Sequence, residues 1–330
     1  RFAGKFYEVL DPLRRPFAAA RGALSPLGSL PDKLRVLMLR RRLARKPLES
    51  VFSSRDITTL AALEKLGFSP RMVDRFFRPF LGGIFLDASL ETSNRMFEFV
   101  FRMFTLGNAA LPAGGMGAIV SQLVARLPQG TVRPNARVES IEEGKVTLAS
   151  GEELRAKAVV IATEGPEAAR LARQIDRPAG RSTTCVYFAA REPPLAGPLL
   201  FLNANRQYAI NNLCVPSEVA AGYAPAGQAL ISVSLIGAVL QNDETLERMI
   251  RERLGHWFGR AVRGWRHLRT YRIPFALPAQ PPGWLEPAER PVRLSPRLYV
   301  CGDHRDNASI QGAMVSGRRA AEAVAEDLSR

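Results

Sequence analysis

The segment RLYVCGDHRDNASIQGAMVSGRRAAEAVAEDL, residues 297–328, combines an apolar run, a polar loop and a helix rich in small residues. Its apolar run, Leu298–Cys301, is followed by Gly302–Asp303 and predicts a short buried strand. A helix is expected to begin near Ser309, with Gly312–Ala313 in its first turns. An aspartate after a parallel strand points into the crevice where open α/β sheets bind ligands. The helix N-terminus that follows suits an anionic group, because its N–H groups and dipole attract negative charge.

The order of these features resembles the closing motif of the FAD-dependent amine oxidase and phytoene desaturase superfamily. In that family a strand ends in Gly-Asp, and the next helix contains Gly-Ala and then Ser-Gly-x-x-Ala-Ala, here Ser316–Ala321. The resemblance implies that Asp303 hydrogen-bonds the ribityl chain of FAD and that the helix start lies under the N1–C2=O edge of the flavin. The FAD contacts that it implies in this segment are Gly302, Asp303, Ser309, Ile310, Gln311, Gly312 and Ala313. The alternative is a terminal helix packed on any parallel sheet.

A second feature of the same kind lies within residues 132–163. The predicted elements are three short strands at 137–141, 146–148 and 154–156, followed by a continuous apolar strand at 158–162. An antiparallel meander that leads into such a strand resembles the end of the superfamily's FAD domain. The resemblance implies that the backbone of Val138 contacts the adenine, and it adds Ala162 and Thr163 to the FAD site. An unrelated α/β meander is the alternative.

The glycine-rich stretch Gly114–Gly117 precedes a predicted helix and superficially suggests a phosphate-binding loop. No strand precedes it and the Rossmann spacing is absent, which argues against that interpretation. The stretch resembles the Pro-x-Gly-Gly-Met segment of the superfamily, which implies that Gly115 and Met116 lie near the isoalloxazine; a plain helix start is the alternative. The strand–GxGxxG–helix unit with which these FAD proteins begin occurs nowhere in the sequence. The simplest interpretation is an N-terminally shortened sequence with half of an FAD site, which would bind flavin weakly or not at all.

The other segments predict a second domain that is interleaved with the first. Its expected strands are at 182–190, 198–203, 208–215 and 229–237, followed by a helix at 243–258 and extended chain at 264–277. The expected fold class is α/β with mixed α+β character: an FAD/NAD(P)-binding Rossmann-like domain, incomplete at its N-terminus, and a substrate domain of helices and a mixed or antiparallel sheet. The expected division is a helical substrate part at 1–107, FAD-domain segments at 108–177 and 290–330, and a substrate-domain sheet at 178–289.

The basic helix predicted for Asp32–Lys46 allows two interpretations. Asp32 is the expected N-cap, and Leu34, Leu37 and Met38 form an apolar stripe beside clustered arginines. Such a helix can lie on an anionic membrane surface, or it can be a solvated helix that packs on its own core.

Phenylalanines concentrate between residues 76 and 104. They could line a pocket for an apolar substrate or fill a core between helices, since aromatic residues dominate cores generally. The stretch 94–104, NRMFEFVFRMF, is apolar on nearly all sides and is expected to be a buried helix.

Composition excludes several classes of protein. The net charge of +15 comes from basic residues spread along the chain, without a helix-turn-helix, zinc-finger or aromatic RNA-binding signature, so no nucleic-acid partner is expected. The three cysteines are odd in number and far apart, which suggests neither a disulfide framework nor a metal site and favours a reducing compartment. No apolar run is long enough to predict a transmembrane helix.

The resemblance therefore implies an FAD-dependent oxidoreductase that moves a hydride from an apolar or amine substrate to flavin N5. FAD carries this chemistry, so no catalytic acid or base is assigned. The alternatives are a non-catalytic scaffold or partner subunit that has lost the nucleotide motif, and a peripheral membrane-binding protein. The expected location is cytoplasmic, or peripheral to a membrane on its reducing side. The substrate, the electron acceptor and the oligomeric state do not follow from the sequence.

Overall fold

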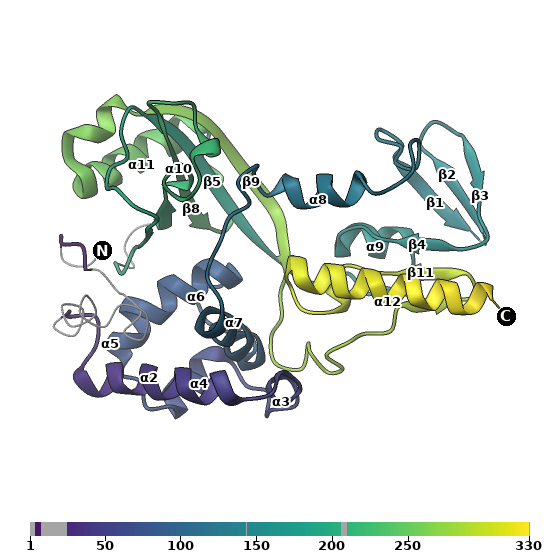
Figure 1. The fold of residues 1–330 in the computed structure, drawn as a ribbon, viewed down its shortest axis with the longest axis horizontal. Helices are drawn as coiled ribbons and strands as arrows, with labels where there is room; N and C mark the ends of the chain where they lie inside the picture. Colours follow the sequence, from purple (N-terminus) through teal and green to yellow (C-terminus); the bar gives the residue numbers. More distant parts are fainter. Residues whose placement is uncertain (1–3, 8–24, 143, 206–209, 330) are drawn as a thin grey trace. The chain divides into compact units, whose positions relative to one another are not determined.

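The structure is a computed structural model that describes residues 4–7, 25–142, 144–205 and 210–329 (Figure 1). It contains two compact units. Unit 1 combines residues Arg1–Ile119 with Arg181–Ala276, and unit 2 combines Val120–Gly180 with Leu277–Arg330. Each unit is thus assembled from two separate stretches of chain. The FAD-binding and substrate-binding roles of the four predicted segments stay predictions.

The first stretch of unit 1 is helical. Its elements are α2 (Leu30–Arg45), α3 (Leu48–Phe52), α4 (Thr59–Lys65), α5 (Pro70–Met72), the π-helical turn η1 (Val73–Phe77), α6 (Arg78–Phe85) and α7 (Asn94–Leu106). Helices α2, α3 and α4 all pack against α7. Phe77, Phe85, Phe97 and Phe101 are buried, and Phe77 contacts Phe97 and Phe101 edge-on or tilted. For these four phenylalanines the core interpretation is confirmed.

Two local predictions for this layer are wrong. The N-cap of α2 is Ser29, whose hydroxyl accepts from the Asp32 N–H, while the Asp32 carboxylate accepts from the Ser29 N–H. Asp32 is therefore the third residue of a capping box, which the sequence pattern alone could not distinguish from a cap. Helix α7 is not buried on all sides: Met103 and Phe104 in its last turns are exposed.

The second stretch of unit 1 is a five-stranded sheet in the order β6-β7-β8-β5-β9. Its strands are β5 (Gly180–Ala190), β6 (Leu200–Leu202), β7 (Ile210–Cys214), β8 (Ala229–Ile236) and β9 (Arg266–Pro278), with α10 (Pro216–Val219), η2 (Ala221–Tyr223), α11 (Asp243–Phe258) and η3 (Gly259–Gly264) in the connections. The first two residues predicted for the strand at 208–215 lie outside the described residues.

Alternation along the strands divides this sheet into two faces. Val186, Phe188 and Ile231 are fully buried and share one core with residues of α11. Cys185 and Tyr187 lie between these core positions on β5 and are only partly buried. Alternate residues of a strand point to opposite faces, so Cys185 and Tyr187 belong to the face that α11 does not cover.

Unit 2 is an α/β arrangement. It contains the antiparallel meander β1 (Val138–Glu142), β2 (Lys145–Leu148) and β3 (Glu153–Arg155), and a second sheet in the order β10 (Arg293–Ser295), β11 (Leu298–Val300) and β4 (Val159–Ile161). Its helices are α9 (Gly165–Leu171), the turn η4 (Asp303–Arg305) and α12 (Ile310–Leu328), while α8 (Gly117–Val124) crosses the boundary between the units. The predicted meander is confirmed, and the two predicted apolar strands pair in parallel with each other.

Helices cover both faces of the second sheet in unit 2. Ile161 and Val300 are buried with Ala168 of α9, whereas Tyr299 is buried with Ala320 and Ala323 of α12. Small residues on α12 allow its backbone to approach the strand closely. Helices on both faces of a parallel strand pair are the arrangement of α/β folds, so the predicted fold class is confirmed.

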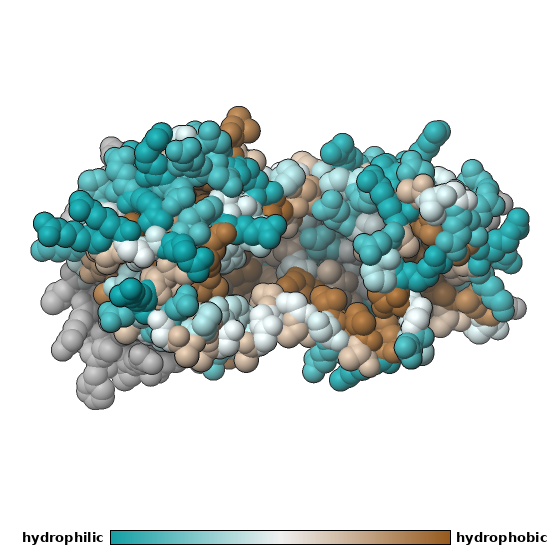
Figure 2. All heavy atoms as spheres, turned by 90° about the horizontal axis from the view of Figure 1, so that it is seen from above, coloured by the Kyte–Doolittle hydropathy of each residue, from teal (hydrophilic) through white to brown (hydrophobic). Residues whose placement is uncertain are grey.

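The visible face of the molecule in Figure 2 is largely hydrophilic and has several separate apolar areas. No helix within the described ranges has the length and apolar character needed to cross a membrane.

Candidate functional site

The carboxyl ends of β4 and β11 form the centre of the candidate cofactor site. These strands pair in parallel with Ile161 opposite Val300, and the Cys301 N–H donates to the Ile161 carbonyl at 2.9 Å. Parallel strands in this register end at the same edge of the sheet. Ala162–Thr163 and Gly302–Asp303 are therefore neighbours.

Gly302 makes a turn that only glycine can adopt without strain. Its φ is +146°, and a Cβ at this position would lie 2.6 Å from the ring of His304 and 3.3 Å from the Thr163 carbonyl oxygen. The Gly302 N–H donates to the hydroxyl of Ser316 on α12 at 2.9 Å, and the same hydroxyl lies 2.9 Å from the Gly302 carbonyl oxygen. The strand end and the helix are thus joined directly behind Asp303.

The start of α12 is built on the backbone of Asn307. Ser309 caps the helix by accepting from the Gly312 N–H at 3.0 Å. A Cβ on Gly312 would lie 2.0 Å from the Asn307 carbonyl oxygen, so the close approach requires glycine here. Buried Gln280 holds the loop from the other side, because its side chain donates to the Asp306 carbonyl and accepts from the Ala308 N–H.

Asp303 and His304 have polar groups that the described protein leaves unpaired. The Asp303 side chain is about one quarter exposed and accepts no hydrogen bond from any described residue; its Oδ1 lies 3.8 Å from Nδ1 of His304. His304 is only 3% exposed, yet neither of its ring nitrogens has a hydrogen-bond partner. A buried polar group without a partner costs free energy, so two neighbouring side chains that lack partners indicate a ligand site.

These groups fit the ribityl part of FAD. The Asp303 carboxylate can accept from ribityl hydroxyls, and His304 can donate or accept according to its tautomer. Ile310 and Gln311 are exposed in the first turn of α12, where helix N–H groups have no intrahelical acceptor. This turn can therefore receive a polar ligand edge, as the resemblance implies for the flavin.

Val138 begins β1, in the other sheet of unit 2. Its carbonyl already accepts a hydrogen bond from Arg170 at 2.7 Å, and Arg170 also donates to the Glu139 carbonyl. Arg170 lies on α9 and fixes this strand end to the helix. The proposed contact of Val138 with adenine stays a prediction.

Gly115 and Met116 belong to unit 1, apart from the other predicted contacts. Gly115 has a φ of +88° and its N–H donates to the Pro112 carbonyl, which also accepts from the Tyr223 hydroxyl. Met116 is 46% exposed. Their predicted place beside the isoalloxazine stays a prediction.

The sequence interpretation missed three residues of the cofactor site. His304 directly follows the Gly-Asp pair and could have been noticed as an ionisable residue in a predicted crevice. Ser316 was recognised only as a small residue, although its hydroxyl holds the Gly302 backbone. Gln280 contacts a loop 26 to 28 residues away, and no local pattern in the sequence signals such a contact.

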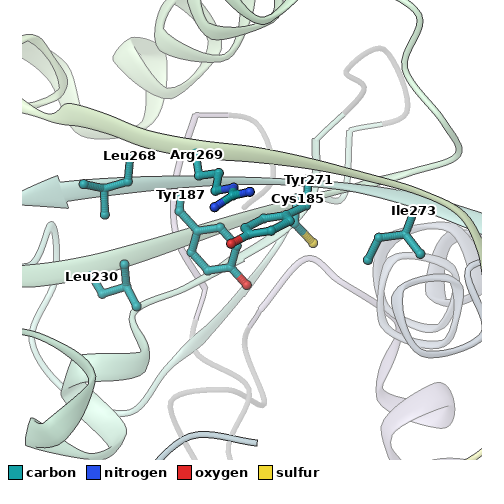
Figure 3. A pocket seen from close by; sticks show the side chains of 7 residues that line it. All are labelled: Cys185, Tyr187, Leu230, Leu268, Arg269, Tyr271 and Ile273. Atoms are coloured by element: carbon teal, nitrogen blue, oxygen red, sulfur yellow. The ribbon is translucent and has the colours of Figure 1, made fainter. Parts of the chain in front are cut away.

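A second candidate site is a pocket on the open face of the five-stranded sheet in unit 1. Its volume is about 470 Å³, within the range of small-molecule sites. Its lining comes from three strands: Cys185 and Tyr187 on β5, Leu230 on β8, and Leu268, Arg269, Tyr271 and Ile273 on β9 (Figure 3). The lining is apolar and aromatic apart from one arginine, which suits a mainly apolar ligand.

Comparison with solved structures shows the fold. The chain is similar to an oxidoreductase from Methanosarcina mazei, with 18% identity, a TM-score of 0.67, and coverage of 89% of this chain and 73% of that one. It is also similar to a redesigned putrescine oxidase, with 12% identity, a TM-score of 0.65, and 94% and 78% coverage. Cyclohexylamine oxidase from Brevibacterium oxydans gives 17% identity, a TM-score of 0.57, and 97% and 77% coverage.

A comparison with curated protein sequences finds no match. The family model of the flavin-containing amine oxidoreductases matches residues 2–325, which is nearly the whole chain. This match covers the Gly302–Asp303 strand end, most of α12 and the five-stranded sheet of unit 1. The protein therefore belongs to the flavin-containing amine oxidoreductase family and is a flavin-dependent oxidoreductase whose cofactor is FAD.

Proposed function

We propose that the protein oxidises an apolar or amine substrate, with unit 2 holding FAD and unit 1 holding the substrate. Support for the first role comes from the Asp303 carboxylate, which lies at the edge where β4 and β11 end and accepts no hydrogen bond from the described part of the chain. When bound, FAD supplies a two-electron acceptor, flavin N5, for a hydride from the substrate. Support for the second role comes from the apolar lining of the pocket on the sheet of unit 1.

The residues named here would bind and orient the cofactor and the substrate. Asp303 would accept from the ribityl hydroxyls, and His304 would complete its hydrogen bonding with the same ligand. Ser316 and Gly312 would act through the backbone, because they fix the positions of Gly302 and of the first turn of α12. The apolar pocket would exclude water from the bound substrate.

Replacing Asp303 by Ala tests the cofactor role. A charge-assisted hydrogen bond contributes roughly 1.5–3 kcal/mol, so FAD affinity should fall about 10- to 100-fold. The melting temperature without FAD should change little, because the carboxylate accepts no hydrogen bond inside the protein. Flavin absorbance per polypeptide and FAD titration measure the effect. Glu322→Ala, an exposed carboxylate on α12, is the control and should retain wild-type affinity; an equal FAD affinity in all three proteins would contradict the proposed role of Asp303.

We also propose that α2 associates with an anionic lipid surface. Leu30, Leu34 and Met38 are 68%, 57% and 52% exposed and recur at every fourth residue, which places them in one row along the helix. This row replaces the predicted stripe, since Leu37 is half-buried. Arg41 and Arg45 are exposed on the same helix and have no ion-pair partner among the residues that the structure describes. An exposed apolar row beside basic residues is typical of interfacial helices.

Replacing Arg41 and Arg45 together by Gln should weaken binding to phosphatidylserine-containing vesicles roughly 30-fold. Each basic residue near such a surface contributes about 1 kcal/mol. Co-sedimentation with these vesicles, and with neutral phosphatidylcholine vesicles, measures the binding. The control carries Arg248→Gln and Arg260→Gln, which remove the same charge from exposed positions in and after α11. Wild-type protein that does not bind, or that binds both vesicle types equally, rules the membrane role out.

A further inference from the structure

The pocket of unit 1 contains a single charged side chain, Arg269. Its guanidinium carbon lies 4.9 Å from the centroid of the Tyr271 ring, and Tyr271 meets Tyr187 edge-on at 5.8 Å with an interplanar angle of 90° (Figure 3). Arg269 is exposed although it lines the pocket, so its charge lies at the rim. Tyr271 and Ile273 are 43% and 39% exposed, so the pocket also presents apolar surface to a ligand.

This arginine has no carboxylate partner within the described part of the chain. Two neighbouring arginines of the same sheet and helix layer do have carboxylate partners. Arg272, on the same strand, pairs with Asp243 at 2.5 Å and donates to two backbone carbonyls. Arg251 pairs with Glu247 at 2.7 Å. The guanidinium of Arg269 stacks on the face of Tyr271, which restrains its position, and its N–H groups have no acceptor among the described residues, so they can bind an anion.

No other group in the pocket offsets this charge. Burial raises the pKa of the Tyr187 phenol, although a hydrogen bond with Ser232 opposes the change. The phenol is therefore neutral at pH 7 and available as a hydrogen-bond donor. Cys185 lies 3.8 Å from the Ser234 hydroxyl and adds a further weakly polar group. The pocket thus presents one fixed positive charge beside aromatic and aliphatic surface.

We propose that this pocket binds molecules that join a carboxylate to an apolar or aromatic body. Arg269 pairs with the carboxylate at the rim, and Tyr187, Tyr271 and Ile273 contact the body. A protonated amine is disfavoured, because its charge would meet the guanidinium without an acidic residue to balance it. This proposal rests on the proposed function in one respect, because the molecule bound in the pocket would be the substrate, with its acidic end at Arg269.

Three probes with one apolar body and different head groups test the proposal: 3-phenylpropionate, 3-phenylpropanol and 3-phenylpropylamine. We expect calorimetric titration of the full chain to show the acid binding at least 10-fold more tightly than the alcohol, with the amine weakest. Arg269→Gln should weaken acid binding about 10- to 100-fold and leave alcohol binding within about threefold, because it removes only the charged contact. Arg266→Gln removes a charge from β9 outside the pocket and should change none of the three affinities.

A charge-reversed variant separates recognition from folding. Arg269→Glu should bind the amine more tightly than the acid, which a merely disrupted pocket could not do. Wild-type protein that binds acid and amine equally, or binds none of the three probes, overturns the proposal, as does unchanged acid affinity in Arg269→Gln. Bound FAD is measured in the same samples. Wild-type protein that takes up FAD but binds none of the three probes contradicts this inference alone, whereas wild-type protein that does not take up added FAD contradicts the proposed function.

Discussion

Gly312→Ala should lose most of its bound FAD and unfold at a lower temperature than the wild type. A Cβ at this position would lie 2.0 Å from the Asn307 carbonyl oxygen, a distance that no carbon and oxygen can share without movement. The contacted atoms are backbone, so the loop 306–309 must shift as a whole. Overpacking of this kind costs about 1–3 kcal/mol, and here it also displaces the helix start beside Asp303.

Gly317→Ala is the matched control for this substitution. It introduces the same methyl group into the same helix, but a Cβ at Gly317 would meet no atom within 4 Å. Replacing glycine by alanine inside a helix stabilises it by roughly 0.5–1 kcal/mol, so this variant should keep its flavin and unfold slightly later. Flavin absorbance per polypeptide and the Tm are measured for both. Equal flavin content in Gly312→Ala and Gly317→Ala would show that the position of the loop does not matter for the cofactor.

The features of unit 2 that the sequence could predict are those carried by local pattern. The meander, the apolar strand before Thr163 and the helix after Ser309 each depend on periodicity or turn residues within a few positions. The structure adds that β4 and β11 pair in parallel and so end at a common edge of one sheet. The sequence did not show why residue 312 must be glycine. The resemblance implies that the start of this helix approaches the flavin, whereas the structure shows that a side chain at 312 would collide with the backbone of Asn307.

Local sequence patterns could not predict contacts between distant parts of the chain. The pocket of unit 1 unites residues from three strands, and Arg269 and Tyr187 are 82 positions apart in the printed sequence. The alternation of a strand predicts which of its residues share a face. It does not predict which residues of other strands line the same pocket, or that none of them is acidic. The N-cap predicted for α2 was also wrong. Ser29, three residues earlier, is the cap, and Asp32 in addition accepts from Ser69, a contact 37 positions away that no local pattern signals.

Asp32→Ala should destabilise unit 1 by about 3–5 kcal/mol, a large part of the stability of an ordinary domain. Asp32 is fully buried and accepts from the N–H and hydroxyl of both Ser29 and Ser69, at 2.7–2.9 Å. These serines cap α2 and α5, so one carboxylate holds two helix starts together. Removing it leaves four donors without their acceptor and loosens both caps, each worth about 1 kcal/mol.

The control for this variant is Glu91→Ala. The Glu91 side chain is 65% exposed and lies 3.8 Å from Arg181, so its removal should cost no more than about 1 kcal/mol. Chemical denaturation at neutral pH measures both variants against the wild type. A cost for Asp32→Ala no larger than that for Glu91→Ala would contradict the structural role of Asp32.

The stabilisation by Asp32 should also depend on pH in a defined direction. Burial alone would raise the pKa of Asp32, but hydrogen bonds from Ser69 and Ser29 outweigh it and lower the pKa from 3.8 to about 2. Because the folded value lies below the unfolded one, this contribution is fully present above about pH 5 and is lost as the pH falls towards 2. The difference in unfolding free energy between wild type and Asp32→Ala should therefore be constant from neutral pH to about pH 5 and then shrink, by roughly 2 kcal/mol in total. Denaturation curves of the two proteins at successive pH values give this difference directly, and a gap that stays constant or widens as the pH falls below 4 would show that the carboxylate is not held in its ionised form by these serines.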